Sequence, residues 1–308
     1  MLPLSTVPLR TVIVGLTFAC LSTILGGTTV ALTRLIIHQT DPLSLSFARY
    51  GMGAIALLIF LYPTLKQKVF SRQDVIGMAA LGVVMFSGFP YFMALGLEFT
   101  TSAHGGLIFS TMPLMTLIIA VAVGVEQLTG IKLAAVALGI VGIVIALGEQ
   151  LGAIAPNALQ GDIYFLIGVM GTSIFNVFSK RYIARYGSLP VLTYTMAVGS
   201  LFMFVLALFL EHPFSGSLNF DVKSWAIVVW LGVPGAALMV YLWCRALALI
   251  TPTQVSITIG LNTLTAMLGG VWLMDEPLSP RIWIGFALIL GAIALVSLHR
   301  PKAVEFQA

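Results

Sequence analysis

Charged side chains are scarce in this sequence. Of its 308 residues, only 8% are Asp, Glu, Lys or Arg, whereas an ordinary soluble domain contains roughly 25%. Hydrophobic residues make up 59%, and so few polar side chains cannot cover the surface of a water-soluble globule. The composition therefore excludes soluble enzymes, soluble nucleic-acid-binding domains and disordered chains, and it predicts a polytopic membrane protein.

The sequence also lacks the residue patterns of metal centres and catalytic sites. Its two cysteines, Cys20 and Cys244, both lie in apolar runs, so we expect no disulfide, no metal site and no cofactor. An enzyme working inside the membrane would need a nucleophile with its base, two aspartates or a metal site. The sequence has no HExxH motif and no carboxylate in the middle of an apolar run. A channel would show a charged or carbonyl-rich filter, which is not visible either, and we expect neither an enzyme nor a channel.

The apolar residues fall into ten runs. A helix needs about 20 predominantly apolar residues to cross a bilayer, and irregular backbone facing lipid cannot satisfy its hydrogen bonds. The sequence therefore predicts an all-α integral membrane protein with ten transmembrane helices. The predicted helices cover residues 12–36, 43–62, 75–97, 103–124, 131–148, 161–183, 190–210, 224–248, 254–273 and 281–298.

The distribution of positive charge predicts the orientation. With a cytoplasmic N-terminus, eleven of the 15 Lys and Arg residues flank the inner side of the predicted helices, and four flank the outer side. The positive-inside rule then places both termini in the cytoplasm of a multi-pass protein of the cell (inner) membrane. The net charge of +4 is explained by this bias, so we expect lipid contact and no nucleic-acid partner.

The two halves of the chain resemble each other. Residues 91–148 align with residues 241–298 without gaps at a shift of 150, and about ten of the roughly 58 aligned positions are identical. The matches include Tyr91 with Tyr241 and Glu126 with Glu276. Because each half has five predicted helices, the second half enters the membrane from the opposite side. The sequence predicts two inverted five-helix repeats, 10–150 and 160–300, around a central cavity, which is a transporter arrangement.

Four stretches resemble the drug/metabolite transporter superfamily, specifically its ten-helix EamA-type family. They are Asp41-Pro42-Leu43 with Phe47-Ala48-Arg49, Met112-Pro113-Leu114 with Glu126-Gln127-Leu128, Ser179-Lys180-Arg181, and Asp275-Glu276-Pro277-Leu278 with Trp283-Ile284-Gly285. One departure is Asn262-Thr263, which stands where the family often has a proline in the ninth helix.

Within this family the chain looks most like exporters of aromatic and other neutral amino acids. The resemblance implies a secondary transporter that exports amino acids and related small metabolites, and the inverted repeat implies alternating access. Because no carboxylate lies in the middle of an apolar run, we expect a facilitator or exchanger. The alternative is an exporter of drugs or other metabolites, with proton coupling as an option. The expected partners are a small-molecule substrate and membrane lipid.

Polar residues inside the runs are costly in lipid and therefore informative. In several runs they recur every three or four residues and so share one helical face. Such faces on repeat-related helices favour a shared substrate cavity, although close interhelical packing is the alternative. Tyrosines would add an aromatic wall for flat side chains. The candidate cavity residues are Thr29, Thr33, Tyr91, His104, Asn176, Tyr241, Gln254, Thr258 and Asn262.

Prolines and acidic residues complete the candidate set. Possible hinges, which could equally be static kinks, are Pro90, Pro113, Pro234 and Gly235. Glu126 and Glu276 come just before the fifth and tenth runs, where a carboxylate can cap a helix N-terminus. Histidine is the residue type that can titrate in the physiological range, which makes His104 the candidate for proton coupling. A hydrogen-bonded polar histidine near the end of a helix is the alternative.

Two arginines and two small-residue motifs have open roles. Arg49 and Arg245 could each guide a substrate carboxylate, but snorkelling to the membrane surface is the simpler expectation. The motifs Ala135-xxx-Gly139 and Ala287-xxx-Gly291 favour close helix contact. That contact serves either packing within one chain or a dimer, so we expect a monomer or a homodimer.

Overall fold

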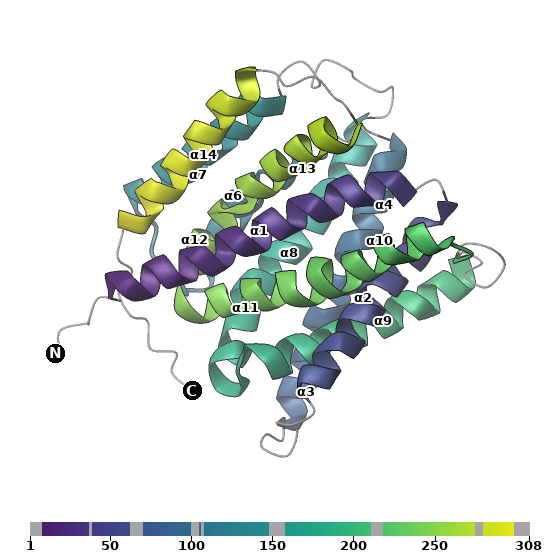
Figure 1. Ribbon diagram of the computed structural model, residues 1–308. Helices are drawn as coiled ribbons and strands as arrows, with labels where there is room; N and C mark the ends of the chain where they lie inside the picture. The colour runs from purple at the N-terminus through teal and green to yellow at the C-terminus, as the bar shows by residue number, and fades with distance from the viewer. Residues whose placement is uncertain are drawn as a thin grey trace.

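The computed structural model describes residues 8–36, 39–61, 70–99, 105, 108–147, 158–210, 218–274 and 280–298. Within these ranges the regular elements are helices and no strand is present, which confirms the predicted all-α class. Figure 1 shows the helices packed side by side in one bundle.

The helices follow the apolar runs of the sequence closely. Two short segments, η3 and η6, are π-helical and continue directly from the α-helices on either side. The bounds are α1 Leu9–Ile36, α2 Pro42–Leu61, α3 Arg72–Val83, η3 Val84–Gly88, α4 Phe89–Phe99, α6 Met112–Ala122, α7 Gly130–Leu147, α8 Ala158–Tyr186, α9 Ser188–Leu210, α10 Val222–Gly232, η6 Val233–Leu238, α11 Met239–Leu249, α12 Pro252–Ile257, α13 Ile259–Met274 and α14 Pro280–Leu298.

Several helical segments have the length and composition of membrane spans. Six described segments are long and apolar enough to cross a bilayer: residues 9–33, 43–61, 72–96, 159–186, 188–210 and 222–249. Shorter apolar helices lie at Met112–Ala122, Gly130–Ile145 and Trp283–Val296. Large apolar side chains also face outwards, and Phe209 is 82% exposed. An apolar exterior of this kind suits contact with lipid, so the protein is a multi-pass membrane protein.

The two π-helical segments lie beside prolines. Pro90 has no N–H to donate to the carbonyl four residues earlier, and its ring would clash with that carbonyl. The helix widens before it, so that the N–H of Phe89 bonds the carbonyl of Val84 five residues back. In the second half Pro234 lies inside η6, and the N–H of Met239 bonds the carbonyl of Pro234. Wide turns of this type are frequent at functional sites.

Glycines allow neighbouring helices to approach closely at two corresponding places. A Cβ atom built on Gly82 of α3 would lie 2.3 Å from the carbonyl oxygen of Thr195 in α9. On Gly232 of α10 it would lie 2.8 Å from Cβ of Met52 and 3.1 Å from the carbonyl oxygen of Arg49, both in α2. A side chain at either glycine would push these helices apart.

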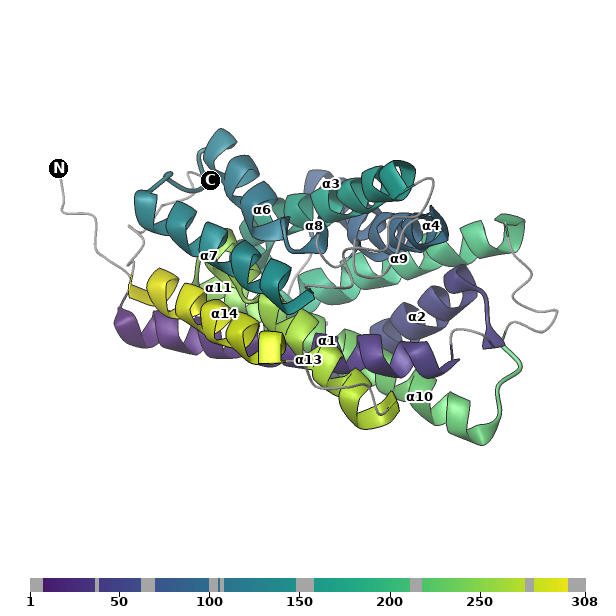
Figure 2. The same ribbon diagram turned by 90° about the horizontal axis from the view of Figure 1, so that it is seen from above.

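Helices α7 and α14 run side by side at one edge of the bundle (Figures 1 and 2). A Cβ on Gly142 would lie 3.1 Å from the carbonyl oxygen of Gly285, and a Cβ on Gly139 would lie 3.8 Å from Cβ of Ala292. Ala135 is fully buried. The small residues of α7 therefore serve packing between helices of the same chain.

Candidate functional site

Arg49 lies inside α2, about two turns after the helix begins. Its Nη2 atom donates to the carbonyl oxygen of Gly235 at 2.9 Å and to Oγ1 of Thr29 at 3.2 Å. The guanidinium is half-buried and points to the junction of α1, α2 and η6. The expectation that Arg49 snorkels to the membrane surface is therefore corrected, because acceptors inside the bundle hold the side chain there.

Gly26 of α1 contacts both Thr29 and Asn262 of α13. Oγ1 of Thr29 donates to the carbonyl of Gly26 at 2.7 Å. A Cβ on Gly26 would lie only 2.3 Å from Nδ2 of Asn262, so the Asn262 amide packs directly on the α1 backbone. Hydrogen bonds join Arg49 to Thr29 and Gly235, and Asn262 contacts α1 at Gly26, whose carbonyl accepts the Thr29 hydroxyl. We call Arg49, Thr29, Gly235 and Asn262 the Arg49 site.

Asn176 is held elsewhere, in the contact of α8 with α11 and α6. Its side chain is fully buried. Its Oδ1 accepts a hydrogen bond from Nε1 of Trp243 at 2.8 Å, and its Nδ2 lies 4.0 Å from Sδ of Met112. In this conformation the amide satisfies the buried indole N–H and joins three helices.

Gln254 and Thr258 stabilise a break in the ninth predicted run. Gln254 and Thr251 form a capping box at the start of α12, and Nε2 of Gln254 donates to the carbonyl of Val296 in α14 at 3.3 Å. Thr258 lies in the turn between α12 and α13, where its hydroxyl donates to the carbonyl of Val255 at 2.7 Å. The run is therefore interrupted even though Asn262-Thr263 replaces the expected proline.

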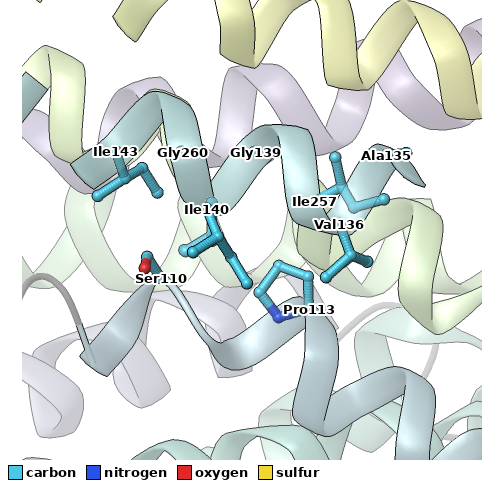
Figure 3. A pocket seen from close by; sticks show the side chains of 10 residues that line it. Ser110, Pro113, Ala135, Val136, Gly139, Ile140, Ile143, Ile257 and Gly260 are labelled. Atoms are coloured by element: carbon cyan, nitrogen blue, oxygen red, sulfur yellow. The ribbon is translucent and has the colours of Figure 1, made fainter. Parts of the chain in front are cut away.

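A small cavity lies beside this interruption (Figure 3). It has a volume of about 10 Å³ and is mainly aliphatic, so it holds one water molecule at most. Ser110 and Pro113 line it near the start of α6, and Ile257, Ile259 and Gly260 line it near the break after α12. Five α7 residues lie in the same lining: Ala135, Val136, Gly139, Ile140 and Ile143. It brings Pro113 close to the break at Thr258, but it is far smaller than an amino acid.

The remaining aromatic and hydroxyl candidates are separated. Tyr91 of α4 packs beside Leu43, Phe47 and Met203, whereas Tyr241 of α11 packs against the main hydrophobic core. Thr33 is half-buried on α1. The two tyrosines therefore belong to different clusters in this conformation. His104 and Glu276 lie outside the described residues.

Glu126 lies in a buried ionic cluster that links the two halves. Its Oε2 pairs with Nζ of Lys132 at 2.6 Å, and the two side chains are 1% and 4% exposed. Its Oε1 accepts the N–H of Thr253 at 2.8 Å. The carboxylate thus lies at the N-terminus of α12 and not at that of α7, the helix that follows it, because Thr253 offers an N–H in the first turn of α12.

Lys180 extends this cluster from α8. Its Nζ donates to the carbonyls of Leu247, at 2.7 Å, and Ile250 at the end of α11, where helical carbonyls lack an intrahelical partner. Glu126 also interacts electrostatically with Lys180. We call Glu126, Lys132 and Lys180 the Glu126 cluster. From the sequence, Lys132 served as a topology signal, and Lys180 as a topology signal and part of the Ser179-Lys180-Arg181 stretch. The position of Lys180 inside the apolar run 161–183 was a visible sign of a buried partner.

Comparison with known proteins gives one consistent result. A sequence model of the EamA-like transporter family matches residues 13–148 and again residues 159–298. Among curated proteins of Bacillus subtilis (strain 168), "Uncharacterized transporter YetK" is 25% identical over 292 residues, which is 92% of this chain and 86% of that protein. "Uncharacterized transporter YyaM" is 25% identical over 223 residues, or 71% of this chain and 72% of that protein.

A solved crystal structure also shares the fold. It is 19% identical to this chain, with a TM-score of 0.78 and coverage of 94% of this chain and 96% of the other. At this identity the similarity establishes the architecture alone.

Proposed function

We propose that this chain, which belongs to the EamA-like transporter family of the drug/metabolite transporter superfamily, exports amino acids and related small metabolites. Aromatic and other neutral amino acids are the favoured substrates. Family membership gives membrane transport of a small molecule, and the amino-acid specificity is our proposal.

Alternating access between two inverted five-helix halves, residues 10–150 and 160–300, is the proposed mechanism. The observation that carries it is the correspondence of η3 and η6. Val84 and Pro234 stand 150 residues apart, the same shift that aligns the two halves in sequence. Helix pairing supports the proposal further, since α1 packs on α11 as α8 packs on α4, and α2 packs on α10 as α9 packs on α3. The separate family matches to 13–148 and 159–298 agree with this division.

The helix interruptions are the proposed hinges. The π-helices put wide turns beside Pro90 and around Pro234 and Gly235, and Pro113 lies in the first turn of α6. A widened or broken helix has fewer backbone hydrogen bonds to lose when it bends. Bending at these points would let the small cavity and the Arg49 site open to one side at a time.

Recognition in this proposal depends mainly on amides, hydroxyls and backbone carbonyls. The sequence offers no carboxylate in the middle of a predicted span for a proton relay, so we propose a facilitator or exchanger. The excess of Lys and Arg on the predicted inner side of the helices supports a position in the cell (inner) membrane with both termini in the cytoplasm.

Exchange in liposomes tests the proposed function. Purified protein in liposomes preloaded with unlabelled phenylalanine should take up labelled phenylalanine or tryptophan. The Asn262→Ala variant should slow uptake, and Phe209→Ala, at a side chain that is 82% exposed, is the matched control that should not. If uptake did not exceed that of protein-free liposomes for any member of a wide amino-acid panel, the amino-acid assignment would be refuted. Uptake of a cationic drug alone would favour the drug-exporter alternative.

A further inference from the structure

Arg49 is a cation inside a membrane span without a described acidic partner. A charged side chain at this depth is costly and normally marks a substrate or ion pathway. No carboxylate whose side chain the structure describes lies within ion-pair distance of Arg49; Glu126 and Asp74 pair instead with Lys132 and Arg185. The charge of Arg49 is therefore not neutralised by any residue whose side chain the structure describes.

The hydrogen bonds of Arg49 leave part of its guanidinium unused. Both described bonds come from Nη2 and go to neutral acceptors, the Gly235 carbonyl and the Thr29 hydroxyl. The Nε atom is buried and has no acceptor in the described part of the chain. Arginine presents its N–H donors as a planar fork that matches a carboxylate. The arrangement fixes the guanidinium in place and keeps donors for an anionic group.

A backbone carbonyl and a side-chain amide lie near the groups that Arg49 contacts. Pro234 has no N–H for the Trp230 carbonyl four residues earlier, and that carbonyl oxygen lies near Gly235, 3.1 Å from the position that a Cβ on this glycine would take. The Asn262 amide lies across Gly26 from Thr29. A molecule with a carboxylate and an ammonium group could bind both kinds of partner, whereas a purely cationic drug would be repelled by the positive charge of Arg49.

We propose that Arg49 binds the α-carboxylate of the transported amino acid and selects zwitterions over amines. This inference rests on the proposed function and names the group by which the substrate is recognised. Arg49 would be a specificity-determining residue, with Thr29 and Gly235 as positioning groups.

A substrate pair that differs only at the carboxylate tests the proposal. Phenylalaninamide keeps the side chain and amine of phenylalanine but lacks the carboxylate. The wild-type protein should transport phenylalanine faster than the amide. Arg49→Gln should lower kcat/KM for phenylalanine about 10- to 100-fold, the range expected for one charge-assisted hydrogen-bonded contact, and leave the amide nearly unchanged. Arg49→Lys, which keeps the charge but loses the fork, should fall between.

Arg245→Gln is the matched control. Arg245 is an exposed arginine on α11 whose guanidinium lies over the ring of Phe18, and its loss should leave the ratio of the two substrates unchanged. Thermal unfolding in detergent should be recorded for every variant, so that transport is compared per folded protein. An equal loss of phenylalanine and amide transport in Arg49→Gln would show a purely structural arginine and overturn the proposal.

Competition on the wild-type protein covers the case in which Arg49→Gln does not fold. The carboxylate 3-phenylpropionate should inhibit phenylalanine uptake more strongly than phenethylamine does, and the reverse order would overturn the inference. If the wild-type protein transports phenylalanine but Arg49→Gln keeps the ratio, only the inference fails. If the wild-type protein transports no amino acid, the proposed function fails and the inference with it.

Discussion

The Arg49 site and the Glu126 cluster both hold a basic side chain inside the bundle, but they differ in the partners of its charge. Each holds a basic side chain against backbone carbonyls at an interrupted helix: Arg49 at Gly235 in η6, and Lys180 at the end of α11. In the Glu126 cluster a carboxylate lies beside the lysines and makes the ion pair with Lys132. At the Arg49 site no described carboxylate does so. The difference between the two regions is an acidic neighbour: Glu126 makes an ion pair with Lys132 and interacts electrostatically with Lys180. On our proposal a substrate carboxylate takes the corresponding place beside Arg49.

The largest expected effect comes from breaking the ion pair of the Glu126 cluster. Glu126→Ala would leave the buried ammonium of Lys132 without its carboxylate and the N–H of Thr253 without its acceptor. Removing one partner of a buried ion pair typically costs about 3–5 kcal/mol. Thermal or denaturant unfolding in detergent would measure this loss of stability.

A double variant separates charge from packing in the same region. Glu126→Leu with Lys132→Met removes both charges, and well-packed apolar replacements of an ion pair are often neutral or stabilising. The double variant should therefore be more stable than Glu126→Ala. If Glu126→Ala had the same unfolding midpoint as the wild-type protein, the structural role of the cluster would be contradicted.

A smaller effect is expected from forcing apart the helices at the Arg49 site. A Cβ on Gly27 would lie 1.7 Å from Oγ1 of Thr265 and 2.6 Å from the carbonyl oxygen of Asn262. Gly27→Ala should therefore cost about 1–3 kcal/mol of stability through overpacking and displace Asn262. Gly130→Ala is the control, because a Cβ there meets nothing within 4 Å. Equal melting temperatures for the two variants would show that α1 and α13 are not in close contact.

The two asparagines should respond differently. Asn176→Ala removes the acceptor of the buried Trp243 N–H and should cost about 1–3 kcal/mol of stability. Asn262 is only partly buried, and its replacement should lower phenylalanine exchange more than stability. Unfolding and exchange assays on both variants check this. Similar losses of stability would erase the distinction between a packing amide and a site amide.

The smallest expected effect lies outside both regions, at Asp221. Its side chain caps the N-terminus of α10. Hydrogen bonds from Ser224 hold the pKa of the Asp221 carboxyl below its usual value of 3.8. A lowered pKa in the folded protein means that the stabilisation is complete above pH 3.8 and is lost as the pH falls through the lowered pKa. Asp221→Asn should remove this acid dependence, which unfolding measurements across that range would detect. If Asp221→Asn lost stability at acidic pH in the same way as the wild-type protein, that loss would come from other carboxyl groups.

Composition and periodicity predicted the helical class and the membrane location because both depend on bulk hydrophobicity. The prolines also marked the interrupted helices correctly, but the π-helical form of η3 and η6 depends on neighbouring helices and could not be derived. Arg49 was misread as snorkelling because the distance from a helix end says nothing about the acceptors that η6 presents. Gln254 carried an unused signal, since Thr251 and Gln254 have the spacing of a capping box.

The initial rate of phenylalanine exchange per folded transporter, measured side by side for Arg49→Gln and for the double variant Glu126→Leu/Lys132→Met, tests the central comparison most directly. Arg49→Gln should lower the rate about 10- to 100-fold. The double variant should stay within about two-fold of the wild-type protein, because the ion pair that it removes is structural. Normal exchange by Arg49→Gln together with loss of exchange in the double variant would contradict both expectations.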